Sequence, residues 1–156
     1  MNDTLLINHM VLIDPFENKV DSIILDRPEI DGNLLRHNIG CNTLARVQLN
    51  NSIDLWVDDE GLFAQDQQFF AIGSYPNPIA GKGLVTGLSG PDTVSLPSTI
   101  TATDIARFVR FIGDQYDLEN FIEMGHIQRP HSGMMDPDTG EVSVFWQWTA
   151  QPREDA

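Results

Sequence analysis

Apolar and polar residues alternate through much of the first half of the chain, which predicts β-strands joined by tight turns. Residues 4–13 are mostly apolar and β-leaning, and residues 20–25 form a second such run after the turn signal Asp14-Pro15, so the two predict a hairpin. Residues 53–58 alternate Ile, Leu and Val with Asp and Trp, as expected of a half-buried strand. Further strands are expected at 44–49, 62–72 and 81–88.

The last third of the chain changes to helical spacing. Thr101 and Asp104 are placed as in a capping box at the start of a helix. The apolar residues that follow recur at i, i+3, i+4, i+7 and i+11, and they are Ile105, Phe108, Val109, Ile112 and Tyr116. A second short helix is expected to be capped by Asp117, so the segment predicts a helical hairpin at 102–125.

The predicted fold class is α+β, with one domain covering residues 1–156 and a mostly antiparallel sheet. The expected parts are a sheet-rich region at 1–90 with a short helix at 29–39, an exposed connection at 91–100, the C-terminal helical hairpin plus a final strand within 101–149, and a frayed tail at 150–156. We expect the final strand to pair with an edge of the first sheet and to bring Trp146 and Trp148 into the core.

The charge of the chain excludes some classes of function. The 156 residues include 23 Asp plus Glu and 9 Lys plus Arg, so the formal net charge is −14. Direct binding of nucleic acid is not expected, because affinity for phosphates comes from clustered Lys and Arg. No apolar run reaches the roughly 18 residues of a membrane-spanning helix. The N-terminus lacks the basic start of a secretory signal, so we expect a cytoplasmic protein without membrane contact.

Four short motifs resemble one known family. They are Asp54-Leu55-Trp56-Val57-Asp58-Asp59-Glu60-Gly61-Leu62, Val11-Leu12-Ile13-Asp14-Pro15, the Ile39-Gly40 stop before Val47-Gln48-Leu49, and Gly81-Lys82-Gly83-Leu84-Val85-Thr86-Gly87. Over residues 10–90 the chain resembles small phage, plasmid and bacterial proteins grouped as domain of unknown function 3846. Members usually have an Asn soon after the acidic turn, where this chain has Gln67 and Gln68. The family has no established activity, and the resemblance implies a mobile-element setting.

Three groups of residues have the chemistry of metal or acid–base sites. His126, His131 and Asp136 are weak candidates for metal ligands, because the two histidines are five apart and not at the i, i+4 spacing of helical zinc sites. The carboxylates of residues 58–60 could bind a cation, but the glycine after them favours a solvated hairpin tip. Residues 136–141 match only the start of a calcium loop, so an ordinary turn is expected there.

Other catalytic patterns are not expected from the sequence. His37 and Cys41 could form a Cys–His pair, but Gly40 between them favours a free buried thiol. No serine–histidine arrangement is visible. The glycines of residues 81–90 precede no helix, so they do not predict a phosphate loop. A DNA-reading helix-turn-helix is rejected because its second helix would present Glu119, Asn120 and Glu123 to phosphates.

These observations predict a small non-enzymatic accessory protein of a phage or mobile element, without cofactors, that binds a host protein with a basic surface. It could act as a nucleic-acid mimic or an inhibitor of host defence. The acidic candidates for this contact are Asp54, Asp58, Asp59, Glu60, Asp114, Asp117, Glu119 and Glu123. Acidity that serves solubility alone is also open.

Two further functions stay open. One is a structural module that forms a homodimer through exposed Phe69 and Phe70, or through Trp146 and Trp148. The other is a small metal-dependent enzyme that uses His126, His131 and Asp136.

Overall fold

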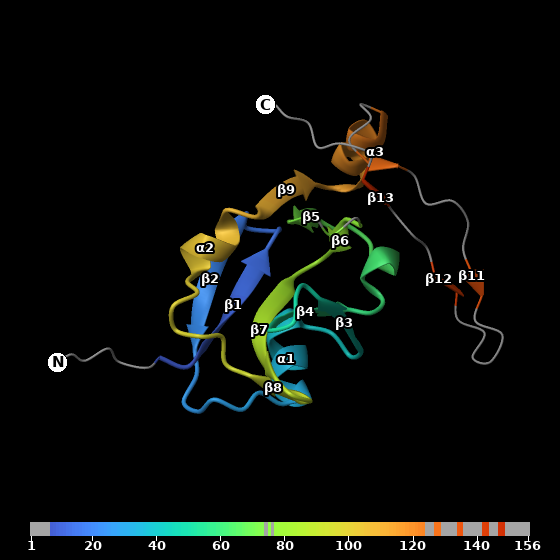
Figure 1. Ribbon diagram of the computed structural model, residues 1–156. Coiled ribbons are helices and arrows are strands. Elements are labelled where there is room, and N and C mark those ends of the chain that lie inside the picture. The colour runs from blue at the N-terminus through green and yellow to red at the C-terminus, as the bar shows by residue number, and fades with distance from the viewer. Residues whose placement is uncertain are drawn as a thin grey trace.

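A six-stranded antiparallel sheet forms the centre of the computed structural model (Figure 1). The structure describes residues 7–73, 75 and 77–123 and the two-residue strands at 127–128, 134–135, 142–143 and 147–148. The order of the main path is β2-β1-β7-β4-β3, with β8 also paired to β7. The strands are β1 (His9–Asp14), β2 (Lys19–Ile24), β3 (Leu44–Gln48), β4 (Ile53–Asp58), β7 (Gly83–Ser89) and β8 (Asp92–Val94).

A second, three-stranded sheet lies at one end of the first (Figure 1). It consists of β5 (Phe69–Ile72), β6 (Ile79–Ala80) and β9 (Val109–Gly113), in the order β6-β5-β9. All of its pairs are antiparallel, and Phe70 lies opposite both Ile79 and Phe111. Two small pairs complete the described strands: β10 (Ile127–Gln128) with β13 (Gln147–Trp148), and β11 (Met134–Met135) with β12 (Val142–Ser143).

Three short helices have side-chain caps or glycine stops that explain their ends. α1 (Gly32–Ile39) begins where the Asp31 side chain accepts a hydrogen bond from Leu34 N, and it ends at Gly40, whose φ is 81°. α2 (Ala102–Ala106) has the predicted Thr101–Asp104 capping box. At the start of α3 (Gln115–Glu123), Asp114 and Asp117 exchange the same pair of hydrogen bonds. None of the described helices is long and apolar enough to cross a membrane.

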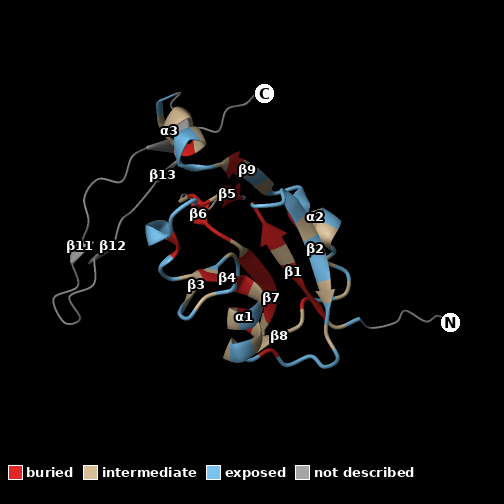
Figure 2. Cartoon of the chain, turned by 180° about the vertical axis from the view of Figure 1, so that it is seen from behind, coloured by how far each residue is buried: buried red, intermediate tan, exposed pale blue. Residues whose placement is uncertain are grey.

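The two faces of the main sheet are buried against different elements. On one face, α1 packs over alternate residues of β1 and β7, with Met10, Leu35 and Leu84 at the centre of this layer. On the other face, Val11, Leu55 and Val85 contact the second sheet and α2. Figure 2 shows β1 and β7 mostly buried, whereas β2 lies at the exposed edge. β1 and β7 are therefore covered on both faces, which agrees with the nearly continuous apolar run that residues 4–13 show in the sequence.

The structure contains the predicted α+β fold with a mostly antiparallel sheet, but the helical hairpin at 102–125 is wrong. α2 ends at Ala106, and residues 109–113 form β9 instead of continuing the helix. The second predicted helix is present as α3, with Asp114 rather than Asp117 in the N-cap position. β9 contains β-branched and aromatic residues, Val109, Phe111 and Ile112, which favour strands. It pairs with β5 in the second sheet.

Three other expectations about chain layout are also corrected. Residues 62–72 are not one strand, because residues 61–63 form a 3-10 helix and β5 begins at Phe69. The expected exposed connection at 91–100 contains β8, and its Leu96 is only 2% exposed. The final strand pairs with β10 and not with an edge of the first sheet. Trp146 and the tail at 150–156 lie outside the described residues.

Candidate functional site

A cleft of about 790 Å³ opens on the face of the main sheet opposite to α1. Its lining comes from three separate parts of the chain: the end of β3 through the start of β4, the end of β5 and the loop after it, and the segment from Ile100 to Phe108. The described lining residues are Gln48, Leu49, Asn50, Ile53, Ile72, Gly73, Tyr75, Ile100, Asp104, Ile105, Arg107 and Phe108. Clefts of this volume with mostly apolar walls are typical binding sites.

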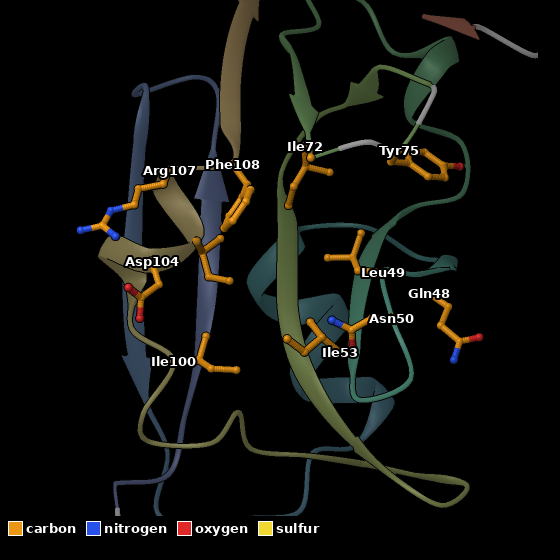
Figure 3. Close-up of a pocket in the computed structure, with 12 residues that line it drawn as sticks. Gln48, Leu49, Asn50, Ile53, Ile72, Tyr75, Ile100, Asp104, Arg107 and Phe108 are labelled. Atoms are coloured by element: carbon orange, nitrogen blue, oxygen red, sulfur yellow. The ribbon is translucent and has the colours of Figure 1, made fainter. Parts of the chain in front are cut away.

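Apolar side chains face one another across this cleft. Figure 3 shows Phe108 and Ile100 on one wall and Ile72 and Ile53 on the opposite wall. Phe108 is 64% exposed, which is high for a side chain of this size. Ile53, Tyr75 and Ile100 are only partly buried, at the margin of the core. The cleft is therefore an opening in the apolar layer between the sheet and α2. Its exposed apolar surface would be removed from water if another molecule bound there, and this burial is favourable.

Gln48, Asp104 and Arg107 lie at the rim of the cleft, whereas Asn50 lies beside Ile53 on one wall (Figure 3). Figure 3 shows the Arg107 guanidinium and the Gln48 amide pointing away from the space between the walls. The Asp104 carboxylate accepts a hydrogen bond from Thr101 N at 3.0 Å, while Asp104 N donates to Thr101 Oγ1 at 3.1 Å. These hydrogen bonds with Thr101, helped by the charge of Arg107, hold the pKa of Asp104 below its ordinary value of 3.8. The rim therefore carries one carboxylate, Asp104, together with the positive charge of Arg107.

The lining combines apolar side chains with a few polar ones. The described lining residues include no His, Cys, Ser, Thr or Lys, and the groups in it that can ionise are Tyr75, Asp104 and Arg107. Asp104 already caps α2.

His9 forms a hydrogen-bonded network that the sequence does not reveal. The β1–β2 register places His9 and Ser22 diagonally on one face, with His9 Nδ1 3.3 Å from Ser22 Oγ. His9 Nε2 lies 3.3 Å from Pro97 O. Because that carbonyl can only accept, Nε2 donates in this contact. The His9 backbone N–H also donates to Ser95 Oγ at 2.8 Å. Through these contacts His9 attaches residues 95–97 to β1.

The predicted acidic surface is only partly at the surface. Asp54 is fully buried and forms an ion pair with Arg46, so its inclusion among the contact residues is wrong. Asp59 and Glu60 are exposed and Asp58 is half-buried, but they do not form a hairpin tip. Asp58 is the last residue of β4, and Asp59 and Glu60 join this strand to the 3-10 helix that leads to the second sheet.

The second acidic group lies on α3 and the residue before it. Asp114 and Glu123 are exposed, whereas Asp117 and Glu119 are half-buried. Hydrogen bonds from the backbone of Asp117 and neighbouring groups hold the pKa of Asp114 below its ordinary value. The structure therefore separates the predicted acidic residues into two surface groups at different places in the chain and one buried residue.

Cys41, for which the sequence favours a free buried thiol over a Cys–His pair, lies in a shallow depression. Arg36, His37, Gly40, Cys41 and Asn42 line a space of about 430 Å³ at the end of α1. Cys41 is free and half-buried. Burial raises the pKa of the Cys41 thiol, and the negative charge of Asp58 raises it further, while Arg36 acts in the opposite direction. The thiol is therefore less nucleophilic than an ordinary cysteine at neutral pH.

The metal candidates and the Trp146–Trp148 dimer face fall on residues whose side chains the structure does not describe, whereas the alternative dimer face at Phe69 and Phe70 can be examined. Within the parts of the chain that can be described, no three His, Cys, Asp or Glu residues are grouped as metal ligands. His126, His131 and Asp136 lie outside the described residues, as does the partial calcium loop at 136–141. Phe69 and Phe70 are 2% and 0% exposed, so the expectation that they form an exposed dimer face is wrong.

The lining of the cleft could not be read from the sequence, because its walls are far apart along the chain. Phe108 is exposed in the cleft, but the helical spacing of the sequence places it on a buried helix face, so the sequence does not identify it as a lining residue. Comparisons of this chain with protein-family models, with curated proteins and with solved structures found no match.

Proposed function

We propose that the protein is a non-enzymatic binding protein whose partner is a protein with a positively charged surface. The observation that carries this proposal is the open cleft, which joins two apolar walls and has no nucleophile–base pair among its described lining residues. A cleft of this kind supports recognition of apolar groups.

Electrostatics supports the choice of a basic partner. The net charge of −14 creates a long-range negative field around a domain of this size. Asp59, Glu60, Asp114 and Glu123 are exposed and contribute to this field. Such a field attracts cationic surfaces and repels anionic ones, which raises the association rate of the former.

The resemblance to family 3846 gives this proposal a setting. Proteins of mobile elements act inside a host cell, so the partner would be a cytoplasmic host protein. A host protein that handles nucleic acid has a basic groove shaped for phosphates, which an acidic domain can occupy. An anti-defence or nucleic-acid-mimic role is therefore the specific form of the proposal.

Affinity capture from a bacterial lysate tests it. The full chain would be compared with Asp59→Asn/Glu60→Gln/Glu123→Gln, which removes exposed charge, and with Asn51→Ala/Gln65→Ala/Thr103→Ala, which changes exposed neutral residues. We expect basic proteins to be retained at about 50 mM NaCl and released at about 300 mM, because the Debye length falls with salt. The charge variant should retain less and the neutral variant the same. Equal retention at both salt concentrations, or by all three proteins, contradicts the proposal.

A further inference from the structure

We propose that the apolar cleft is the docking site for one amphipathic α-helical segment of the partner, with Leu-like residues on one face and Lys or Arg on the other. This inference rests on the proposed function, and it adds where the partner binds and which chemistry is recognised.

The shape of the cleft matches a row of apolar side chains. Its walls present Phe108, Ile105 and Ile100 on one side and Ile72 and Ile53 on the other. Figure 3 shows an open space between the two rows that continues along both walls. A helix places apolar side chains at i, i+3 or i+4 and i+7 in such a row, and helix-in-groove recognition uses this arrangement. A volume of about 790 Å³ holds several such side chains.

Charge decides which helix fits. The opposite face of a bound helix and its flanks would lie in the negative field set by the net charge of −14, since the rim itself carries one acid, Asp104, and one base, Arg107. Lys and Arg on that face are complementary to this field, whereas acidic residues would be repelled. A second copy of this chain is disfavoured as occupant, since each copy has a net charge of −14.

A set of synthetic peptides tests the docking site on the full chain. The probe is a labelled peptide of about 14 residues made of Leu and Lys, with Leu at helical spacing. One control has the same composition with Leu scrambled off the helical face, and another replaces every Leu by Ser. Binding would be measured by fluorescence anisotropy at about 50 and 300 mM NaCl. We expect the amphipathic peptide to bind at least about tenfold more tightly than the scrambled one at both salt concentrations.

Variants locate the bound peptide. Phe108→Ser removes an exposed side chain from the cleft and should weaken binding at least about fivefold. Tyr116→Ser is the matched control, because Tyr116 is also an exposed aromatic residue, at 73%, but does not line the cleft. Asn50→Trp keeps Phe108 in place and narrows the cleft from the opposite wall, so it should also weaken binding. This second variant keeps the test valid if Phe108→Ser does not fold.

The outcomes separate this inference from the function on which it rests. Equal binding of the helical and scrambled peptides, with salt dependence retained, overturns the docking site and leaves the electrostatic proposal standing. Binding that depends on Phe108 but not on salt supports the docking site and contradicts the basic partner. A dimer in light scattering that Phe108→Ser dissociates assigns the cleft to a second copy and overturns the inference.

Discussion

Arg46 and Asp54 form an ion pair across neighbouring strands in which the carboxylate is fully buried and the guanidinium reaches solvent. Arg46 Nε donates to Asp54 Oδ2 at 3.0 Å, and the Arg46 side chain is 44% exposed. Asp54 Oδ1 is also buried, and it makes no hydrogen bond to any residue that the structure describes. The carboxylate therefore depends on Arg46 for compensation of its charge.

Loss of Arg46 should destabilise the protein more than loss of an exposed arginine. Arg46→Leu leaves a buried carboxylate unpaired, and we expect the free energy of unfolding to fall by about 2–3 kcal/mol, less than for a fully buried pair because solvent reaches the guanidinium. The control is Arg27→Leu, whose contact with Asp26 is exposed on both sides and should contribute less than about 0.5 kcal/mol. Urea denaturation measures both. Equal effects of the two variants would show that Asp54 does not depend on Arg46.

Gly83 and Gly32 should respond in opposite directions to replacement by alanine. A Cβ at Gly83 would lie 2.8 Å from Leu55 Cδ1 and 3.0 Å from Phe70 Cζ, inside the core between the two sheets. We expect Gly83→Ala to lower the free energy of unfolding by about 1–3 kcal/mol through overpacking. Gly32→Ala meets only the flexible Arg36 side chain and should stabilise α1 by up to about 1 kcal/mol. Thermal unfolding of both variants checks the pair, and a stabilised Gly83→Ala protein would contradict the close packing.

The two helix caps should contribute to stability above the ordinary pKa of aspartate, and this contribution should be lost in acid. Hydrogen bonds from Thr101 to Asp104, and from Asp117 to Asp114, lower the pKa values of both carboxyls in the folded state. The unfolded state therefore takes up protons first as the pH falls, and stability decreases from about pH 4 downward through the folded pKa values. Asp104→Asn/Asp114→Asn keeps an acceptor at each cap but does not titrate.

Denaturation curves between about pH 6 and pH 3 measure this effect. The wild-type midpoint should fall more steeply below about pH 4 than the midpoint of the double variant. Parallel curves for the two proteins would show that the caps do not stabilise the charged form of these carboxyls.

Cys41 should react slowly with alkylating reagents in the folded protein. Burial and, secondly, the charge of Asp58 raise the pKa of its thiol, so the thiolate fraction at about pH 8 is smaller than in the unfolded chain. Asp58→Asn removes the negative charge and should accelerate alkylation by iodoacetamide, whereas Asp59→Asn should have a smaller effect. Equal rates for wild type and Asp58→Asn would mean that Asp58 does not influence the thiol.

The sequence predicts the main sheet well because its strands are long and alternate regularly. The hairpin at Asp14-Pro15, the strand at 53–58 and the stop at Gly40 all agree with the structure. Turn and cap signals are local, so nearby residues are enough to specify them. The Thr101–Asp104 capping box was predicted for the same reason.

The segment after that cap was mispredicted because a short apolar run fits two periodicities. Ile105 and Ile112 are buried as the helical pattern predicted, but Phe108 and Tyr116 are 64% and 73% exposed. The missing information is long-range: β5 requires a partner strand, and β9 provides it. The cleft could not be predicted for the same reason, because its lining depends on where β9 and α2 lie relative to β4.

The two walls of the cleft also determine how an occupant would affect the fold. Leu49 and Ile53 come from one half of the chain, and Ile100 and Phe108 from the other. A molecule that contacts both walls would bridge two segments that are far apart along the chain and come together only in the folded protein. Its binding should raise the melting temperature in proportion to the logarithm of its concentration and slow proteolytic cleavage near α2. A thermal-shift screen can therefore recognise an occupant before any biological role for it is known.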